Sequence, residues 1–235
     1  MMRKSILATG VALVIASSVS WGFGLPKIPG VSAATSGDSG GVTADSVEQF
    51  VVAGQVSNLA INEARVMLAA ALSTKEERAK LMSQREQINK GLDAKDKKAA
   101  EESKAFAESL DAQLKAGLAD QSKVDSLKSL SADQKKAVGN SVLSLGYGIM
   151  LQKDQITAGQ NMITQMSSNP MLATKLPSIK NTVTTMAANL SGTAGYITNL
   201  PKLLSAVNVK AKMPTSKDDK PAEAPANITD VFANN

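Results

Sequence analysis

Few residue types in this chain are able to support catalysis. The sequence contains neither histidine nor cysteine, which excludes imidazole acid–base catalysis, thiol chemistry, disulfide bonds and metals held by these side chains. Serine and threonine are plentiful, but they have no imidazole base to activate them, and no local Ser–Lys signature is recognisable. The sequence therefore predicts a protein that is not an enzyme and that holds no cofactor.

Methionines and carboxylates are the remaining candidate metal ligands. Met162, Met166 and Met171 form the closest group among ten methionines and would suit copper, but methionine is also an ordinary filler of helical cores. A carboxylate di-metal site in a bundle needs inward glutamates and Glu-x-x-His motifs. The long uncharged region offers one acid, Asp154, so we predict no metal site.

The two tyrosines of the chain, Tyr147 and Tyr196, form the candidate binding site. Gly146 and Gly148 adjoin the first and Gly195 adjoins the second. In an antiparallel hairpin that turns near residue 172, positions whose numbers sum to about 344 lie at one level, and the tyrosine numbers sum to 343. Since glycine removes bulk beside each ring, we expect both rings to border a cleft, with each hydroxyl bonded to a partner or to water. The alternative is two unrelated, half-exposed tyrosines.

Two long helices are expected to position these residues. Apolar residues recur at spacings of three and four from Val138 to Met166 and again from Leu176 to Val207, which is the pattern of a sustained helical seam. Ser131 and Gln134 form a capping box at the start of the first helix. The fold class predicted is all-α, an elongated antiparallel bundle of about four to five helices built on a long hairpin, residues 132–167 and 177–208.

Glycines inside this hairpin require an explanation, because each one costs about 1 kcal/mol relative to alanine in a helix interior. Close approach of neighbouring helices is one reason, and a bend assisted by Pro201 is another. A hairpin that is able to change shape, or that has a groove between its helices, is the functional alternative. The glycines are Gly139, Gly146, Gly148 and Gly159 in the first helix, and Gly192 and Gly195 in the second.

Three further helices are expected before the hairpin. A capping-box-like Asp45–Glu48 begins a helix over 45–72, and Ser73–Glu77 begins another that ends near Gly91. A third covers 95–119, with Phe106, Leu110, Leu114 and Leu118 along one side, and one or two helical turns follow over 124–130.

Charge divides the chain into two unlike parts. Residues 75–136 hold 14 basic and 12 acidic side chains, whereas 137–201 hold only Lys153, Asp154, Lys175 and Lys180. We expect the charged helices to lie outside, with the hairpin and the first helix filling the interior. The alternative is that the hairpin enters a membrane, since residues 181–201 are uncharged and long enough to span it, although rich in Asn and Thr.

The ends of the chain are expected to lie outside the fold. Residues 1–24 read as a signal peptide, with Arg3 and Lys4 before an apolar stretch over 6–19. An uncleaved anchor is the alternative, and cleavage falls within 20–34. Residues 25–44 are a flexible Gly/Ser/Pro leader, 45–209 the helical domain and 210–235 a disordered tail.

These observations predict a periplasmic or secreted protein of the bacterial envelope. A net charge of +5, reduced to +3 without Arg3 and Lys4, and only 3% aromatic residues argue against nucleic-acid binding. The predicted function is protein–protein or surface interaction by a non-enzymatic helical bundle, with a protein or cell-surface partner. The sequence does not predict the oligomeric state. A membrane-active, pore-forming-like protein and a carrier of a small apolar ligand are the alternatives.

Overall fold

The computed structural model describes residues 42–90, 97–216, 219, 221 and 228–232, and side chains within 42–85 and from 101 onward. The described residues form an all-α bundle, as predicted, and contain no strand. The predicted signal peptide, most of the leader and the predicted helix end at Gly91 lie outside the described residues.

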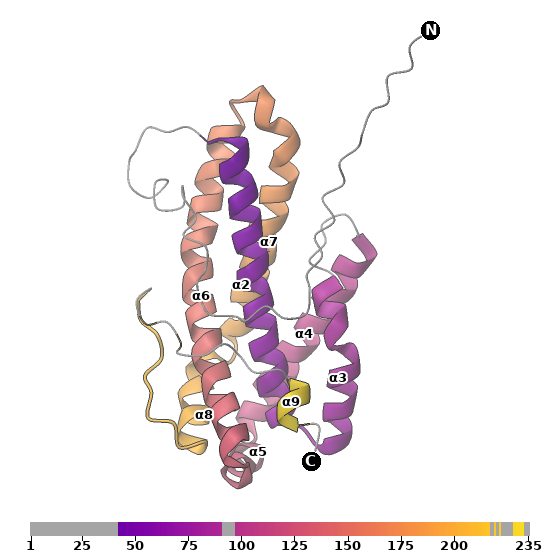
Figure 1. Ribbon diagram of the computed structural model, residues 1–235, viewed down its shortest axis with the longest axis vertical. Coiled ribbons are helices and arrows are strands. Elements are labelled where there is room, and N and C mark those ends of the chain that lie inside the picture. Colours follow the sequence, from indigo (N-terminus) through magenta and orange to yellow (C-terminus); the bar gives the residue numbers. More distant parts are fainter. Residues whose placement is uncertain (1–41, 91–96, 217–218, 220, 222–227, 233–235) are drawn as a thin grey trace.

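The central element is α2 (Ala44–Ala71), which contacts α3, α4, α6, α7 and α9. In Figure 1 it runs lengthwise between α6 and α7. Its N-terminus is capped by Thr43, whose hydroxyl accepts from the Ser46 backbone N–H while Ser46 bonds back to Thr43. The cap therefore lies two residues before the predicted Asp45. From Ala64 to Leu72 every residue is buried, so this end of α2 is surrounded by other elements.

The predicted hairpin is present, but its second helix is interrupted. The long first helix, α6 (Ala132–Met166), starts at the Ser131–Gln134 capping box as expected, and η2 (Pro170–Lys175) leads into α7 (Leu176–Ala194). The expectation of one helix over 177–208 is wrong, because η3 (Ile197–Asn199) and α8 (Leu200–Ala206) follow as separate pieces. Pro201, in the first turn of α8, has no N–H and its ring would clash with a continuing helix.

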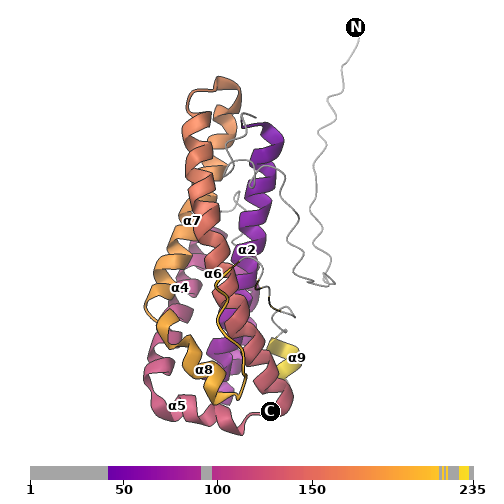
Figure 2. The same ribbon diagram turned by 90° about the vertical axis from the view of Figure 1, so that its left-hand side faces the viewer.

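The charged helices pack against one half of α2. These are α3 (Lys75–Lys90) and α4 (Lys97–Ala119), and α5 (Gln121–Ser126) and η1 (Leu127–Ser129) then lead to α6. The predicted apolar side of α4 is buried: Phe106, Leu110, Leu114 and Leu118 are at most 7% exposed. Figures 1 and 2 show that α2, α6 and α7 extend beyond α3 and α4, so the bundle has a half built from these three helices.

The C-terminal part of the chain differs from the expected disordered tail. Asn208, at φ 58°, reverses the chain after α8, and the Val209 N–H donates to the Leu204 carbonyl at 2.8 Å. Residues 209–216, here called the strap, then run along α6 in both ribbon views (Figures 1 and 2). Farther on, α9 (Ile228–Phe232) buries Phe232, whose ring lies 5.0 Å from the Arg78 guanidinium carbon.

Two apolar clusters fill the interior. The upper cluster occupies the three-helix half and consists of Val47, Phe50, Ala158, Met162, Met166, Leu172, Ile179 and Met186. A larger lower cluster occupies the other half, where it begins at Ile61 on α2 and at Ile149 on α6 and includes the buried residues of α4, α8 and α9. Met162 and Met166 therefore pack in the core, which is the interpretation that the sequence analysis set against a copper site.

Candidate functional site

Buried polar side chains form a layer across the bundle between the two apolar clusters. Each helix of the three-helix half contributes to it, and α4 adds one carboxylate from the side. We call these residues the polar layer: Ser57, Asn58, Asn62 and Arg65 of α2, Gln152 and Gln155 of α6, Asn189 of α7, Asp111 of α4, and Tyr196 between α7 and η3. Buried polar groups are tolerated in such numbers only when they bond to one another.

Arg65 lies at the centre of the polar layer and is 0% exposed. Its Nε is 3.0 Å from Asp111 Oδ1, which supplies the counter-charge. Its Nη1 donates to the side-chain oxygens of Asn62 at 3.1 Å and Asn189 at 2.8 Å, and its Nη2 donates to the Asn189 carbonyl at 2.9 Å. The guanidinium therefore joins α2, α4 and α7 in one network of charge-assisted bonds.

Tyr196 completes the charged end of the polar layer. Its hydroxyl donates to Asp111 Oδ1 at 2.8 Å and lies 3.4 Å from Arg65 Nε. Burial raises the pKa of Asp111, although the Arg65 charge and the Tyr196 hydrogen bond act in the opposite direction. Burial also raises the pKa of Tyr196, so the phenol stays a donor over the whole physiological range.

Amide groups form the other end of the polar layer. The Asn58 side-chain oxygen accepts from Gln152 Nε2 at 2.6 Å and from Asn189 Nδ2 at 2.7 Å. Ser57 Oγ donates to Gln155 Oε1 at 3.0 Å. Each of these bonds forms only when the two helices lie at one relative height along the bundle. The network therefore fixes the register of α2, α6 and α7 against one another.

Glycines allow α4 to cross α7 closely at this site. A Cβ placed on Gly192 would overlap the Asp111 carboxylate, and one placed on Gly195 would meet the Lys115 side chain at 3.6 Å. Gly192 therefore leaves the space that the Asp111 carboxylate occupies beside Arg65. The prediction that helical glycines mark close approach is confirmed at this crossing.

The structure places the predicted site residues as follows. Tyr196 belongs to the polar layer, and Tyr147 is buried on α6 at 2% exposure, so neither is half-exposed. A Cβ on Gly146 would meet Met213 of the strap, one on Gly148 would meet Ile61 of α2, and Gly195 faces α4. These three glycines thus face three different elements, and their role in binding a ligand stays a prediction.

Of the polar layer, only Tyr196 was predicted from the sequence as a candidate site residue. Asn58, Asn62 and Arg65 are spaced by four and three residues, which is the spacing of a buried helical face. Gln152 lies three residues after Ile149 and four before Ile156, so it occupies a position of the apolar spacing in α6 where a polar residue is unexpected. Those two facts together were the available signal for a polar contact between the helices.

The chemistry of the polar layer is that of positioning. Its single carboxylate is shared between Arg65 and Tyr196. Its amides bond to one another, except that Gln152 Oε1 has no hydrogen-bond partner among the described residues. In the described part of the chain, no group of three or more acidic side chains is placed to hold a metal ion. The helices there also include none that is both long and apolar enough to cross a membrane.

Comparison with known proteins gives no further assignment. Neither protein-family models, nor curated proteins, nor solved structures match this chain.

Proposed function

We propose that this protein is an exported, non-enzymatic helical bundle of the bacterial envelope that acts by protein–protein contact. The supporting observation is the surface of the α6–α7 hairpin in the three-helix half. Exposed charged residues border this surface at Lys153, Asp154, Lys175 and Lys180. We call the area between them the hairpin face, and its exposed residues are Thr157, Gln160, Asn161, Thr164 and Gln165 of α6, and Asn181, Thr184, Thr185, Ala187, Ala188 and Ser191 of α7.

The hairpin face contains no charged residue, which is unusual for a protein surface. Surfaces of small domains commonly hold about 25–35% charged residues, and the 62 residues over 75–136 hold 26. Ions lose their hydration when a surface is covered, so the central parts of protein interfaces are depleted in charge. A surface of hydroxyls, amides and small apolar groups therefore suits contact with another uncharged protein surface.

The polar layer supports this proposal mechanically. Asn189 of α7 and Gln152 of α6 both bond to Asn58 of α2, so both helices of the hairpin face are tied to the same side chain. A surface whose helices are held in register is preorganised for binding, and preorganisation reduces the entropy lost on association.

Site-specific photo-cross-linking tests the proposed contact. A photoreactive amino acid at Ala188 of the hairpin face should give defined adducts in producing cells, while the same group at Ala105, an exposed residue of α4, should not. Ala188→Lys should remove the adducts formed from Thr184, and Ala105→Lys should leave them. Equal adduct patterns from Ala188 and Ala105, or none from Ala188, would contradict the proposed surface.

Export is tested separately from contact. The basic n-region and the apolar stretch that follows it predict a mature protein that begins between Trp21 and Leu25. N-terminal sequencing of the protein from an envelope fraction measures this directly, and membrane-bound material that still starts at Met1 would contradict it.

A further inference from the structure

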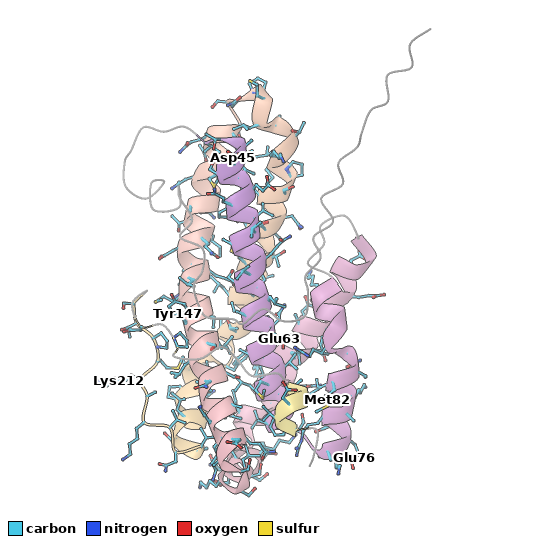
Figure 3. All side chains as sticks on the ribbon, in the orientation of Figure 1. Asp45, Glu63, Glu76, Met82, Tyr147 and Lys212 are labelled. Atoms are coloured by element: carbon cyan, nitrogen blue, oxygen red, sulfur yellow. The ribbon has the colours of Figure 1, made fainter. Side chains whose placement is uncertain are left out.

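The strap is held on α6 by its side chains. Val209 packs at Gly139 and Met213 packs at Gly146, two helical positions where the absence of a Cβ leaves room for them. Inward and outward residues alternate along it, because Val209, Ala211 and Met213 are partly buried while Lys210 and Lys212 are exposed. This alternation is the period of an extended chain. Figure 3 shows Lys212 on the outer side of the strap.

The backbone of the strap is unpaired over most of its length. Among the described residues, none of the backbone hydrogen bonds outside the helices involves residues 210–214. An extended segment with free N–H and C=O groups offers the same bonding pattern as the edge strand of a sheet. Such an edge pairs readily with a second extended chain.

Lysine supplies all the charge in the sequence that leads to and forms the strap, and the carboxylate of Asp219 accepts hydrogen bonds from Thr215 and Ser216 at the far end of the strap. The sequence has no acidic residue from Gln155 to Lys217. Six lysines lie in this stretch, among them Lys202 of α8 and the two exposed lysines of the strap. An acidic partner would therefore meet attraction at Lys210 and Lys212, while Asp219 places a negative charge only at the far end of the strap.

We propose that the strap is an interaction edge that takes an extended, acidic segment of a partner protein. The partner's backbone would exchange hydrogen bonds with residues 210–213, and its acidic side chains would lie beside Lys210 and Lys212. A polypeptide fits better than an anionic membrane or a polyanion, because phosphate and sulfate groups accept hydrogen bonds but cannot donate to the free carbonyls of the strap. This edge is separate from the hairpin face.

Binding of a short probe peptide to the full mature protein tests the inference. The probe is a labelled, end-blocked hexapeptide that alternates glutamate with valine, and its binding is followed by fluorescence anisotropy. The double variant Lys210→Gln/Lys212→Gln should weaken binding about twofold to thirtyfold, the effect expected for losing two exposed ion pairs. Circular dichroism should show the same helix content for wild type and variant, since both lysines are exposed.

A matched variant and a matched probe separate the proposal from its alternatives. Lys175→Gln/Lys180→Gln removes the same charge from exposed sites elsewhere in the acid-free stretch, and it should change binding less than about twofold. A probe of equal charge that is N-methylated at every residue should bind much more weakly, because neither of its edges can donate backbone hydrogen bonds to the strap. Equal losses in the two double variants, or equal binding of the N-methylated probe, would overturn the inference. So would loss of binding to anionic phosphatidylglycerol vesicles in the strap variant with unchanged peptide binding. None of these results depends on cross-linking at Ala188.

Discussion

Removal of the Asp111 carboxylate should destabilise the bundle far more than removal of a surface carboxylate. Asp111→Ala takes away the oxygen 3.0 Å from Arg65 Nε and the acceptor of the Tyr196 hydroxyl at 2.8 Å. Breaking a buried ion pair by deleting one partner costs about 3–5 kcal/mol. The Asp111 side chain is 13% exposed, so in the variant water is able to reach Arg65 and Tyr196 and to restore part of the lost bonding. We therefore expect a loss at the lower end of that range, about 3 kcal/mol.

Urea unfolding followed by far-ultraviolet circular dichroism measures this loss of unfolding free energy, and thermal unfolding measures the matching change in Tm. For a chain of this length, 3 kcal/mol corresponds to a fall in Tm of about 6–12 °C. Asp125→Ala is the control, since the side chains of Asp125 and its partner Lys128 are 46% and 68% exposed, and it should leave the unfolding midpoint nearly unchanged because solvent screens such a pair. The double variant Arg65→Met/Asp111→Ala should lose less stability than the sum of the losses in the two single variants, by about 1 kcal/mol or more. Equal stability of the Asp111 and Asp125 variants would refute the reasoning.

Three further predictions concern the same site. Because burial raises the pKa of Asp111 above 3.8, the folded state keeps its proton longer than the unfolded state, and the associated stability is lost as pH rises through the folded pKa. The advantage of wild type over Asp111→Asn in urea unfolding should therefore shrink as pH increases from 3.8, whereas parallel pH curves would argue against it. Gly192→Ala should destabilise by about 1–3 kcal/mol through overlap with Asp111, although alanine is the better helix former. In Gly195→Ala the added Cβ meets Lys115 at 3.6 Å, so thermal stability should change by less than about 0.5 kcal/mol. A larger loss in Gly195→Ala than in Gly192→Ala would contradict the close crossing of α4 and α7. Tyr196→Phe should cost about 1–1.5 kcal/mol at neutral pH. Its difference from wild type should narrow above pH 10, where an unfolded tyrosine ionises while the raised pKa of Tyr196 keeps the folded one protonated; a constant difference would speak against the buried hydroxyl.

The helices themselves were predictable because their signals are local. Capping side chains and apolar spacing placed α2 and α6 within one residue of their observed bounds. The hairpin register was also predictable in part, since a Cβ on Gly159 would meet Val183, and the numbers of that pair sum to within two of the predicted 344.

The interruption after α7 was missed because the apolar spacing continues through it. Ile197, Leu200 and Leu204 keep the seam period on both sides of the break, so periodicity alone predicts a continuous helix. Pro201 has no N–H to donate to the Ile197 carbonyl, so one continuous helix cannot form through this point. Tyr196 also turns inward toward Asp111 and Arg65. Those partners lie on helices distant in sequence, and single-sequence patterns do not report them.

The docked C-terminal part was missed for a different reason. Composition rich in Lys, Pro and Ala predicted disorder over 210–235, but the alternation of Val209, Ala211 and Met213 with lysines is a short extended pattern. Its significance depends on Gly139 and Gly146, which receive the strap side chains. A pattern of five residues has little predictive value until the surface that accepts it is known.

Division of the interior into two apolar clusters has a consequence for how the molecule opens. The upper cluster is the smaller one and involves only α2, the hairpin and its turn, whereas the lower cluster is shared among more elements. Cooperative units with fewer buried contacts open at lower free energy, so amide hydrogens of the hairpin end should exchange faster than those of the lower half. The hairpin face lies on this less protected unit. A partner that binds there would slow exchange at the hairpin end and leave the lower half unchanged, because binding stabilises the folded form of that end alone.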